Sequence, residues 1–325
     1  MTAKLGVLGL ALLLLVTVPL WVGGTYYVNI MSQVLIAAIF ALGLNVLVGY
    51  AGLVSLGHAG LFGVAGYGAA ILLNAGYGHV AAILCCLTIT LAVTAVFAVL
   101  ALRATGIGFI MITLALGQIL WGLAYRWISL TNGDNGISAA SRPAPFGWSL
   151  ASAASFYFAT LAVFLVAVFA MAIFCRSPFG ASLRGTCDQP RRMTALGYNV
   201  WMIRFLACLF SGFWSGVAGL LFFYYNQFIS PHTMALTASA EVLLMVISGG
   251  SGTLLGPIAG AALVVIMKNV ASAYIERWNF MLGAIFVAIV IFMPEGFVPG
   301  TARLARRGWE ALRPRAAPAP AEGGR

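Results

Sequence analysis

Few side chains in this sequence could carry out acid–base or ionic chemistry. The chain holds seven acidic residues and three histidines, and none has the spacing of a metalloprotease, a catalytic triad or a metal site. We therefore expect neither an enzyme nor a metal-binding protein. Within the apolar runs, Glu241 and His58 are the groups that could mark an ion or solute path, because such side chains are costly in lipid.

Each of these two residues has an alternative interpretation. Glu241 directly precedes the apolar stretch 242–247, so it could be an acid at a helix N-terminus, stabilised by the helix dipole. His58 is flanked by Gly57 and Gly60 and could be a packing histidine with satisfied hydrogen bonds. Polar residues between membrane helices often serve only interhelical hydrogen bonding. The candidate substrate-path residues are Asn45, Ser55, His58, Thr113, Gln118 and Glu241.

The sequence contains no nucleotide-binding signature. A P-loop requires Gly-x-x-x-x-Gly-Lys-Ser/Thr, so that backbone amides and the lysine hold the phosphates. The lysines are Lys4 and Lys268, and neither has this context. If ATP drives the protein, a partner must hydrolyse it, and ATP and Mg²⁺ would be cofactors of that partner.

Transmembrane helices must position these residues. The composition is 62% hydrophobic and 7% charged, whereas soluble domains are about 25% charged. No Asp, Glu, Lys or Arg occurs from Leu5 to Leu102, and one crossing takes about 20 apolar residues. The runs are continuous rather than alternating, which favours helices over a barrel. We predict an all-α polytopic membrane protein with about eight to ten spans, from runs at 5–22, 33–50, 54–73, 81–101, 109–128, 156–175, 205–226, 241–272 (interrupted) and 279–294.

The positive charges predict the orientation. Arginines gather in 176–204 and again in 301–325, and an excess of Lys and Arg marks cytoplasmic segments. Counting crossings back from 176–204 places the amino terminus inside and 129–155 outside, while an inside carboxyl terminus requires 241–272 to cross twice or to enter and return. The net charge of +10 fits this asymmetry in a bacterial inner membrane better than it fits nucleic-acid binding. Residues 1–300 would form the transmembrane domain, and 301–325 a basic, disordered cytoplasmic tail.

Two of the runs are broken by glycine and proline, at 52–68 and at 248–257. Unwound backbone at membrane depth is tolerated only where protein or a water-filled cavity covers it, so paired breaks point to a transport path. The alternative is close helix packing through small residues, as the GxxxG spacings Gly212/Gly216 and Gly256/Gly260 would also allow.

The segment 177–197 has the signals of a short surface element. Ser177 followed by Pro178 predicts a helix start, and Gly197 is placed to end a second short helix. The alternative is a solvated loop that merely follows the positive-inside rule.

Several motifs, in order along the chain, resemble the permease subunits of branched-chain amino acid ABC importers, and most closely the LivM-type member of the LivH/LivM pair. They are GLNVLVGYAGLVSLGHA at 43–59, TNGDNGI at 131–137, SPFG at 177–180, ALG at 195–197, and EVLLM at 241–245 followed by Gly256-Pro257. The resemblance extends from about residue 33 to residue 299. Pro190, Arg191 and Arg192 depart from it, because many relatives carry an acidic or small polar residue there.

The resemblance implies a permease that moves branched-chain or related amino acids by alternating access. Its partners would be a second, LivH-like permease, two cytoplasmic ATPase subunits, a periplasmic solute-binding protein and membrane lipid. The implied ATPase-coupling residues are Ser177, Pro178, Gly180, Arg184, Asp188, Arg191, Arg192 and Gly197, and those near the binding protein are Asn132, Asp134 and Asn135. The rival class is a secondary transporter or channel for a small polar solute such as urea or a short amide, which would need a set of charged coupling or pore residues.

Overall fold

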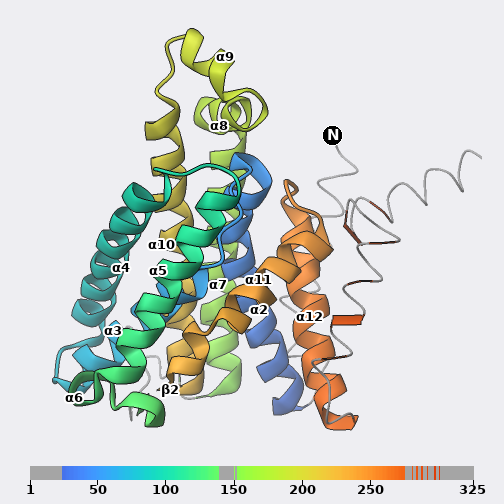
Figure 1. Cartoon of the computed structure of the whole chain (residues 1–325). Helices are drawn as coiled ribbons and strands as arrows, with labels where there is room; N and C mark the ends of the chain where they lie inside the picture. The colour runs from blue at the N-terminus through green and yellow to red at the C-terminus, as the bar shows by residue number, and fades with distance from the viewer. Residues whose placement is uncertain are drawn as a thin grey trace, which may run out of the picture.

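Apolar helices form almost all of the structure, a computed structural model that describes residues 24–138, 150 and 152–274 and isolated positions between 280 and 300 (Figure 1). The predicted run 5–22 and the tail 301–325 lie outside the described residues, as does run 279–294 except for isolated positions. The all-α prediction is confirmed, with one exception. Two-residue strands β1 (Ile137–Ser138) and β2 (Phe228–Ile229) pair antiparallel, with Ile137 opposite Ile229.

The predicted runs appear as helices, with boundaries that differ by several residues; α2 begins earlier than expected. Within the described part of the chain, five helices are long and apolar enough to cross a membrane, and three apolar helices are shorter. The five long helices are α2 (Thr25–Asn45), continued by the π-helix η1 (Val46–Ala51), α4 (His79–Ala101), α5 (Ile107–Arg126), α7 (Ala153–Arg176) and α10 (Val200–Asn226). The three shorter apolar helices are α3 (His58–Asn74), α11 (Leu236–Gly249) and α12 (Leu255–Tyr274). The remaining short elements are α6 (Ile128–Thr131), η2 (Gly133–Asn135), α8 (Pro178–Asp188), α9 (Pro190–Ala195) and η4 (Pro231–Met234).

Helix α2 is the centre of the bundle. It packs against α7, α10, α11 and α12, while α10 also packs against α3 and α4. The most apolar window of α2 and η1 is 83% buried, whereas the corresponding windows of α4 and α5 are 28% and 22% buried. Because the outer helices are equally apolar, their exposed faces are suited to lipid or to a second membrane subunit.

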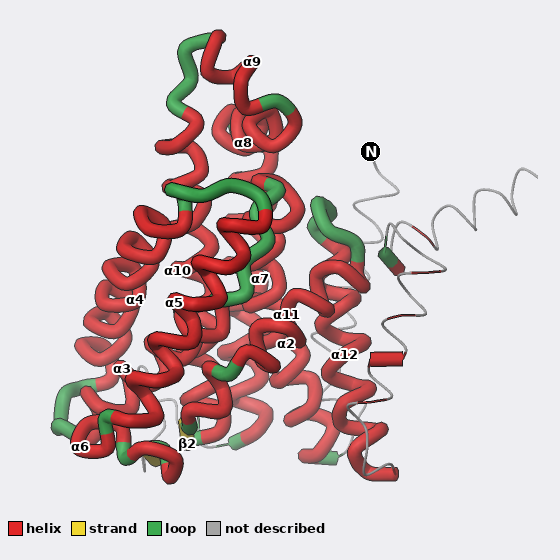
Figure 2. Tube along the Cα trace, viewed as in Figure 1, coloured by secondary structure: helices red, strands yellow, loops and turns green. Residues whose placement is uncertain are grey.

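The two ends of the bundle carry different elements. Helices α8 and α9 project at one end, the same end as the α4–α5 connection, whereas α6 and the β1–β2 pair lie at the opposite end (Figures 1 and 2). Position 103 and the segment 176–204 thus lie at one end and the described residues 129–138 at the other, which is the alternation that counting crossings predicts.

The interrupted run 241–272 folds as a helical hairpin, α11 and α12, that turns at 250–254. With 14 residues, α11 is about 21 Å long at 1.5 Å per residue, so it is too short to cross a hydrocarbon core of about 30 Å alone. A Cβ on Gly260 would overlap the Met245 carbonyl, and one on Gly249 would overlap Gly256. The predicted close packing at Gly256/Gly260 is therefore confirmed.

Close packing is confirmed at the other glycine pair as well. A Cβ on Gly212 would overlap the Thr94 side chain, and one on Gly216 would lie 3.0 Å from Thr90 Cγ2. These two glycines of α10 therefore bring α4 close, which rigidly joins the two halves of the sequence.

Candidate functional site

The second interrupted segment contacts the chain just before the first one, at the side chain of Asn45. Its Nδ2 donates to the carbonyl oxygen of Thr253 at 2.9 Å, and its Oδ1 accepts from the backbone N–H of Gly252 at 3.0 Å. Gly49 lies so close that an added Cβ would overlap the Gly252 backbone. The amide of Asn45, which we predicted to face the substrate path, thus satisfies two backbone groups of the α11–α12 turn.

The π-helix η1 directly precedes the first interruption. Such wide turns are rare and often occur at functional sites. Gly52 ends η1 with a left-handed φ of 66°, a conformation that costs glycine little. The backbone then runs outside helical geometry to Gly57 before α3 starts at His58.

Helix α5 covers this non-helical backbone. The hydroxyl of Thr113 accepts a hydrogen bond from the N–H of Leu56 at 3.3 Å and donates one to the Ile110 carbonyl at 2.9 Å. A Cβ on Gly57 would overlap the backbone of Thr113. Irregular backbone in this bundle is therefore packed against protein, as membrane burial requires.

His58 is buried and joined to serines on both sides. Its Nε2 lies 2.7 Å from the Ser211 hydroxyl, and its Nδ1 lies 3.0 Å from the Ser55 hydroxyl. Ser211 donates its own proton to the Gly43 carbonyl at 2.6 Å. It must therefore accept from Nε2–H, which leaves Nδ1 to accept from Ser55 in a neutral imidazole. This network links α2, α3 and α10.

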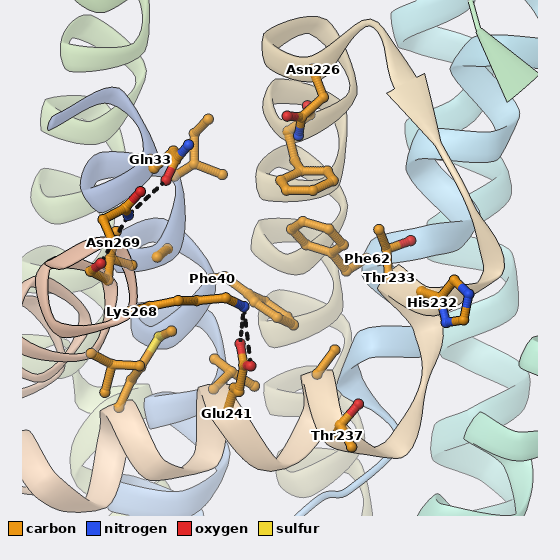
Figure 3. Close-up of a pocket in the computed structure, with 18 residues that line it drawn as sticks. Gln33, Phe40, Phe62, Asn226, His232, Thr233, Thr237, Glu241, Lys268 and Asn269 are labelled. Atoms are coloured by element: carbon orange, nitrogen blue, oxygen red, sulfur yellow. Dashed lines mark hydrogen bonds and ion pairs between the residues drawn. The ribbon is translucent and has the colours of Figure 1, made fainter. Parts of the chain in front are cut away.

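A cavity of about 470 Å³ lies among α2, α3, α10, η4, α11 and α12 (Figure 3). Glu241 and Lys268 meet inside it, with Lys268 Nζ 3.1 and 3.2 Å from the two carboxylate oxygens. The residues that line the cavity are Gln33, Ile36, Ala37, Phe40, Phe62, Phe222, Asn226, His232, Thr233, Thr237, Ala238, Glu241, Val242, Met245, Val264, Val265, Lys268 and Asn269.

The helix-dipole interpretation of Glu241 is wrong. Helix α11 begins at Leu236 and has no acid in its first turn, so Glu241 lies in the second turn and its charge is neutralised by Lys268 of α12. Lys268 is not among the site residues that the sequence predicts. A signal for it exists, because one acid and one base occur in consecutive apolar segments and charged residues within a membrane usually pair.

The remaining walls of the cavity are of two kinds. On one side, Asn269 donates to Gln33 Oε1 at 3.1 Å, and Gln33 donates to the Tyr225 hydroxyl at 3.1 Å. On the other side, the rings of Phe40 and Phe62 have centroids 4.7 Å apart, and Phe222 follows 5.2 Å from Phe62. The cavity therefore combines a polar amide chain, an ion pair and an aromatic wall.

The six predicted path residues do not share one site. Ser55, His58 and Thr113 line a separate small cavity of about 20 Å³, which has room for roughly one water molecule. Glu241 lines the large cavity, and Gln118 is half-buried on α5 and lines neither. Asn45, at the α11–α12 turn, lines neither cavity. The six residues therefore lie in four places, because residues on different turns face different neighbours.

Helices α8 and α9 form the predicted surface element. Ser177 caps α8 by accepting from the N–H of Gly180 at 3.1 Å, with Pro178 in the first turn, and Gly197 follows α9 with a φ of 87°. The predicted start and stop signals are both confirmed. Asp188, Arg191 and Arg192 are exposed.

The inner side of α8 contacts the end of α2. Arg184 donates to the Cys175 carbonyl at 3.1 Å, and its guanidinium lies 5.7 Å from the centroid of the Tyr50 ring. A Cβ on Gly52 would lie 2.6 Å from Cys187 Sγ. Burial, together with the neighbouring Asp188 carboxylate, raises the pKa of the Cys187 thiol against the opposing effect of Arg204, so this thiol stays protonated at neutral pH. Helix α8 thus packs directly on η1.

Replacing Ser177 by alanine is expected to loosen the start of α8. The substitution removes the cap on the Gly180 N–H and should cost about 1 kcal/mol of local stability. Hydrogen exchange of the amides at 179–182 should accelerate about fivefold, while Ser177→Thr, which keeps a hydroxyl, should stay near wild type. Equal exchange in the alanine and threonine variants would contradict the capping role.

The opposite end is joined across the sequence by weaker polar contacts. Asn132 donates to the Gly136 carbonyl at 3.2 Å, and Asp134 Oδ1 lies 3.6 Å from His232 Nε2. Asn135 is exposed. Together with the β1–β2 pairing, these contacts hold the segment 132–138 against the connection between α10 and α11.

Comparison with known proteins identifies the class. Residues 26–290 match the family described as branched-chain amino acid transport system permease component. The chain belongs to this family. Two similar proteins are the high-affinity branched-chain amino acid transport system permease proteins LivM of Salmonella typhimurium and Escherichia coli, each 29% identical over 301 residues that cover 84% of this chain and 70% of the relative. No solved structure matches the chain significantly.

The family membership confirms the resemblance in the sequence and makes the chain a permease subunit. It favours this class over the secondary transporter or channel.

Proposed function

We propose that this protein is the LivM-type permease subunit of an ABC importer and forms part of an inner-membrane path for branched-chain or related amino acids. The observation that carries the proposal is the direct contact between the basic surface helices and the broken centre of the bundle: α8 packs on η1, and Asn45, next to η1, holds the α11–α12 turn. A membrane subunit driven by an external ATPase needs such a connection. The names of the relatives support the substrate class.

The proposed assembly contains a second, LivH-like permease, two cytoplasmic ATPase subunits and a periplasmic solute-binding protein. The ATPase subunits bind ATP and Mg²⁺ and hydrolyse the nucleotide; this chain does not. Both termini and the α8–α9 end face the cytoplasm, because the arginine-rich segments gather there in the sequence. Asn132, Asp134 and Asn135, at the opposite end, face the binding protein. The exposed apolar faces of α4 and α5 contact lipid or the second permease.

The exposed side of α8 and α9 is the surface that docks into an ATPase cleft. Ser177, Pro178 and Gly180 set the direction of α8, and Gly197 ends the element. Asp188, Arg191 and Arg192 point away from the bundle as polar contacts, while Arg184 holds α8 to α7. When the ATPases displace α8, the movement is transmitted through η1 and Asn45 to the α11–α12 hairpin, which lines the cavity. Alternating access follows from this movement.

Charge reversal of Arg191 and Arg192 tests this role. We expect the Arg191→Glu, Arg192→Glu variant to reduce ATP-driven leucine uptake at least about tenfold, because like charges across a docking surface are strongly disfavoured. The measurement is co-purification of the ATPase subunits in mild detergent, followed by ATPase and uptake assays in proteoliposomes. Arg103→Glu is the charge-reversal control and should keep its ATPase subunits, since Arg103 is exposed at the same end but lies outside α8 and α9.

Two results would contradict the proposed function. One is a wild-type chain that purifies alone and moves solute down an ion gradient without ATP. The other is a charge-reversed variant that retains its ATPase subunits and transports at the wild-type rate.

A further inference from the structure

The cavity contains two opposite charges whose side chains are partly exposed. The Glu241 and Lys268 side chains keep 26% and 45% of their surface exposed although they are paired with each other. Ion pairs between partly exposed side chains are weak, because water competes for both partners. A ligand that carries an ammonium group and a carboxylate on one carbon can form an ion pair with each of the two residues.

The rest of the lining is suited to an apolar group. Close to the ion pair, α2 and the α11–α12 hairpin contribute aliphatic and aromatic side chains, and the phenyl rings of α3 and α10 continue this surface (Figure 3). The volume of about 470 Å³ is in the range of small-molecule sites, which are mainly apolar with a few placed polar groups. The apolar lining residues are Ile36, Phe40, Phe62, Phe222, Val242, Met245, Val264 and Val265.

We infer that this cavity binds a hydrophobic amino acid as its zwitterion. The carboxylate of Glu241 accepts the ligand's α-ammonium group, the ammonium of Lys268 binds its α-carboxylate, and its side chain lies against the apolar lining. The assignment rests on the proposed function, which it deepens by naming the two residues that recognise the main-chain charges of the substrate.

The balance of charge gives the cavity its selectivity. A monovalent amine or acid can pair with only one of the two residues, so it gains one ion pair where a zwitterion gains two. A zwitterion satisfies both. An uncharged amide provides neither charge and competes poorly with the existing ion pair.

The position of the ion pair connects ligand binding with movement of the α11–α12 hairpin. Glu241 and Lys268 lie on the two arms of the hairpin whose turn is held by Asn45. Separation of the two charges by a ligand changes the spacing of α11 and α12, and this change reaches the same turn that contacts η1.

The binding test uses the purified permease–ATPase complex without the solute-binding protein, because that protein also recognises amino acids. The probes at equal millimolar concentration are L-leucine, isopentylamine, which lacks the carboxylate, and 4-methylpentanoate, which lacks the ammonium group. We expect only L-leucine to raise the thermal unfolding midpoint. Equal shifts with all three probes, or no shift with L-leucine, would overturn the assignment.

The transport test compares three variants with wild type. Glu241→Gln and Lys268→Gln each remove one charge of the ion pair, so reduced stability could explain a loss of uptake in either single variant. The double variant Glu241→Gln, Lys268→Gln removes both charges and keeps the polar contact. If the pair only stabilises the fold, this variant recovers uptake. We expect instead that it assembles and unfolds like wild type, yet takes up leucine at least tenfold more slowly.

The outcomes distinguish failure of the binding site from failure of the proposed function. Arg126→Gln, which neutralises a charge on α5 outside the cavity, is the control and should transport normally. If wild type and the double variant take up leucine at the same rate, the assignment of the site is wrong but the proposed function is unaffected. Absence of ATP-driven amino acid uptake by the wild-type complex would overturn the proposed function and the site together.

Discussion

A Gly49→Val variant is expected to lose transport and about 2–5 kcal/mol of stability. Even the first carbon of a side chain at position 49 overlaps the Gly252 backbone and crowds Asn45 Oδ1. Overpacking costs about 1–3 kcal/mol. The displaced turn also loses both hydrogen bonds to Asn45, each worth about 0.6–1 kcal/mol between membrane helices.

The thermal unfolding midpoint in detergent and ATP-driven uptake in proteoliposomes measure this effect. Gly122→Ala is the matched control, because a Cβ at position 122 of α5 meets no atom within 4 Å and alanine favours helix. Stability and uptake of Gly122→Ala should equal or exceed those of wild type. A Gly49→Val protein with wild-type uptake would show that the contact between Gly49 and the α11–α12 turn is not needed for transport.

His58→Leu is expected to destabilise the protein by about 1–3 kcal/mol without changing the apparent KM for the amino acid. Leucine leaves the buried hydroxyl of Ser55 without the acceptor that it has now, and an unsatisfied buried polar group costs about this much. Ser211 keeps its bond to Gly43, so α2 and α10 remain joined. Because His58 lies outside the large cavity, substrate affinity should not follow the loss of stability.

The matched control is His79→Leu. His79 is half-buried at the start of α4 and has a long contact of 3.4 Å with the Tyr224 hydroxyl, so its loss should cost under about 1 kcal/mol. Unfolding midpoints and uptake against amino acid concentration distinguish the two positions. A tenfold rise of KM in His58→Leu at unchanged stability would show that His58 touches the substrate.

The helical fold could be predicted because long uncharged runs have few alternatives in a membrane. The capping signals at Ser177 and Gly197 were equally reliable, since they depend on neighbouring residues only. In both cases the physical cause is local in sequence.

The arrangement of the site could not be predicted in the same way. Asn45 forms hydrogen bonds with Gly252 and Thr253 only because α2 packs beside the α11–α12 hairpin. The sequence indicates Glu241 but not its partner Lys268, because a linear sequence does not show which residues of two helices face each other. Their pairing follows from the rotation of two helices, which hydrophobic patterning leaves undetermined when all faces are apolar.

The long sequence separations of the buried polar contacts impose an order on biogenesis. Asn45 and Thr253 are 208 residues apart, and the Ala59 N–H and its acceptor Ser239 are 180 apart. During synthesis, α2 and α3 are therefore complete long before their polar partners leave the ribosome. Until α10 to α12 are inserted, the amides and hydroxyls of the early helices lack their final acceptors in a solvent that offers few others. Chains that stop before α11 should consequently be the ones that quality-control proteases of the membrane remove first.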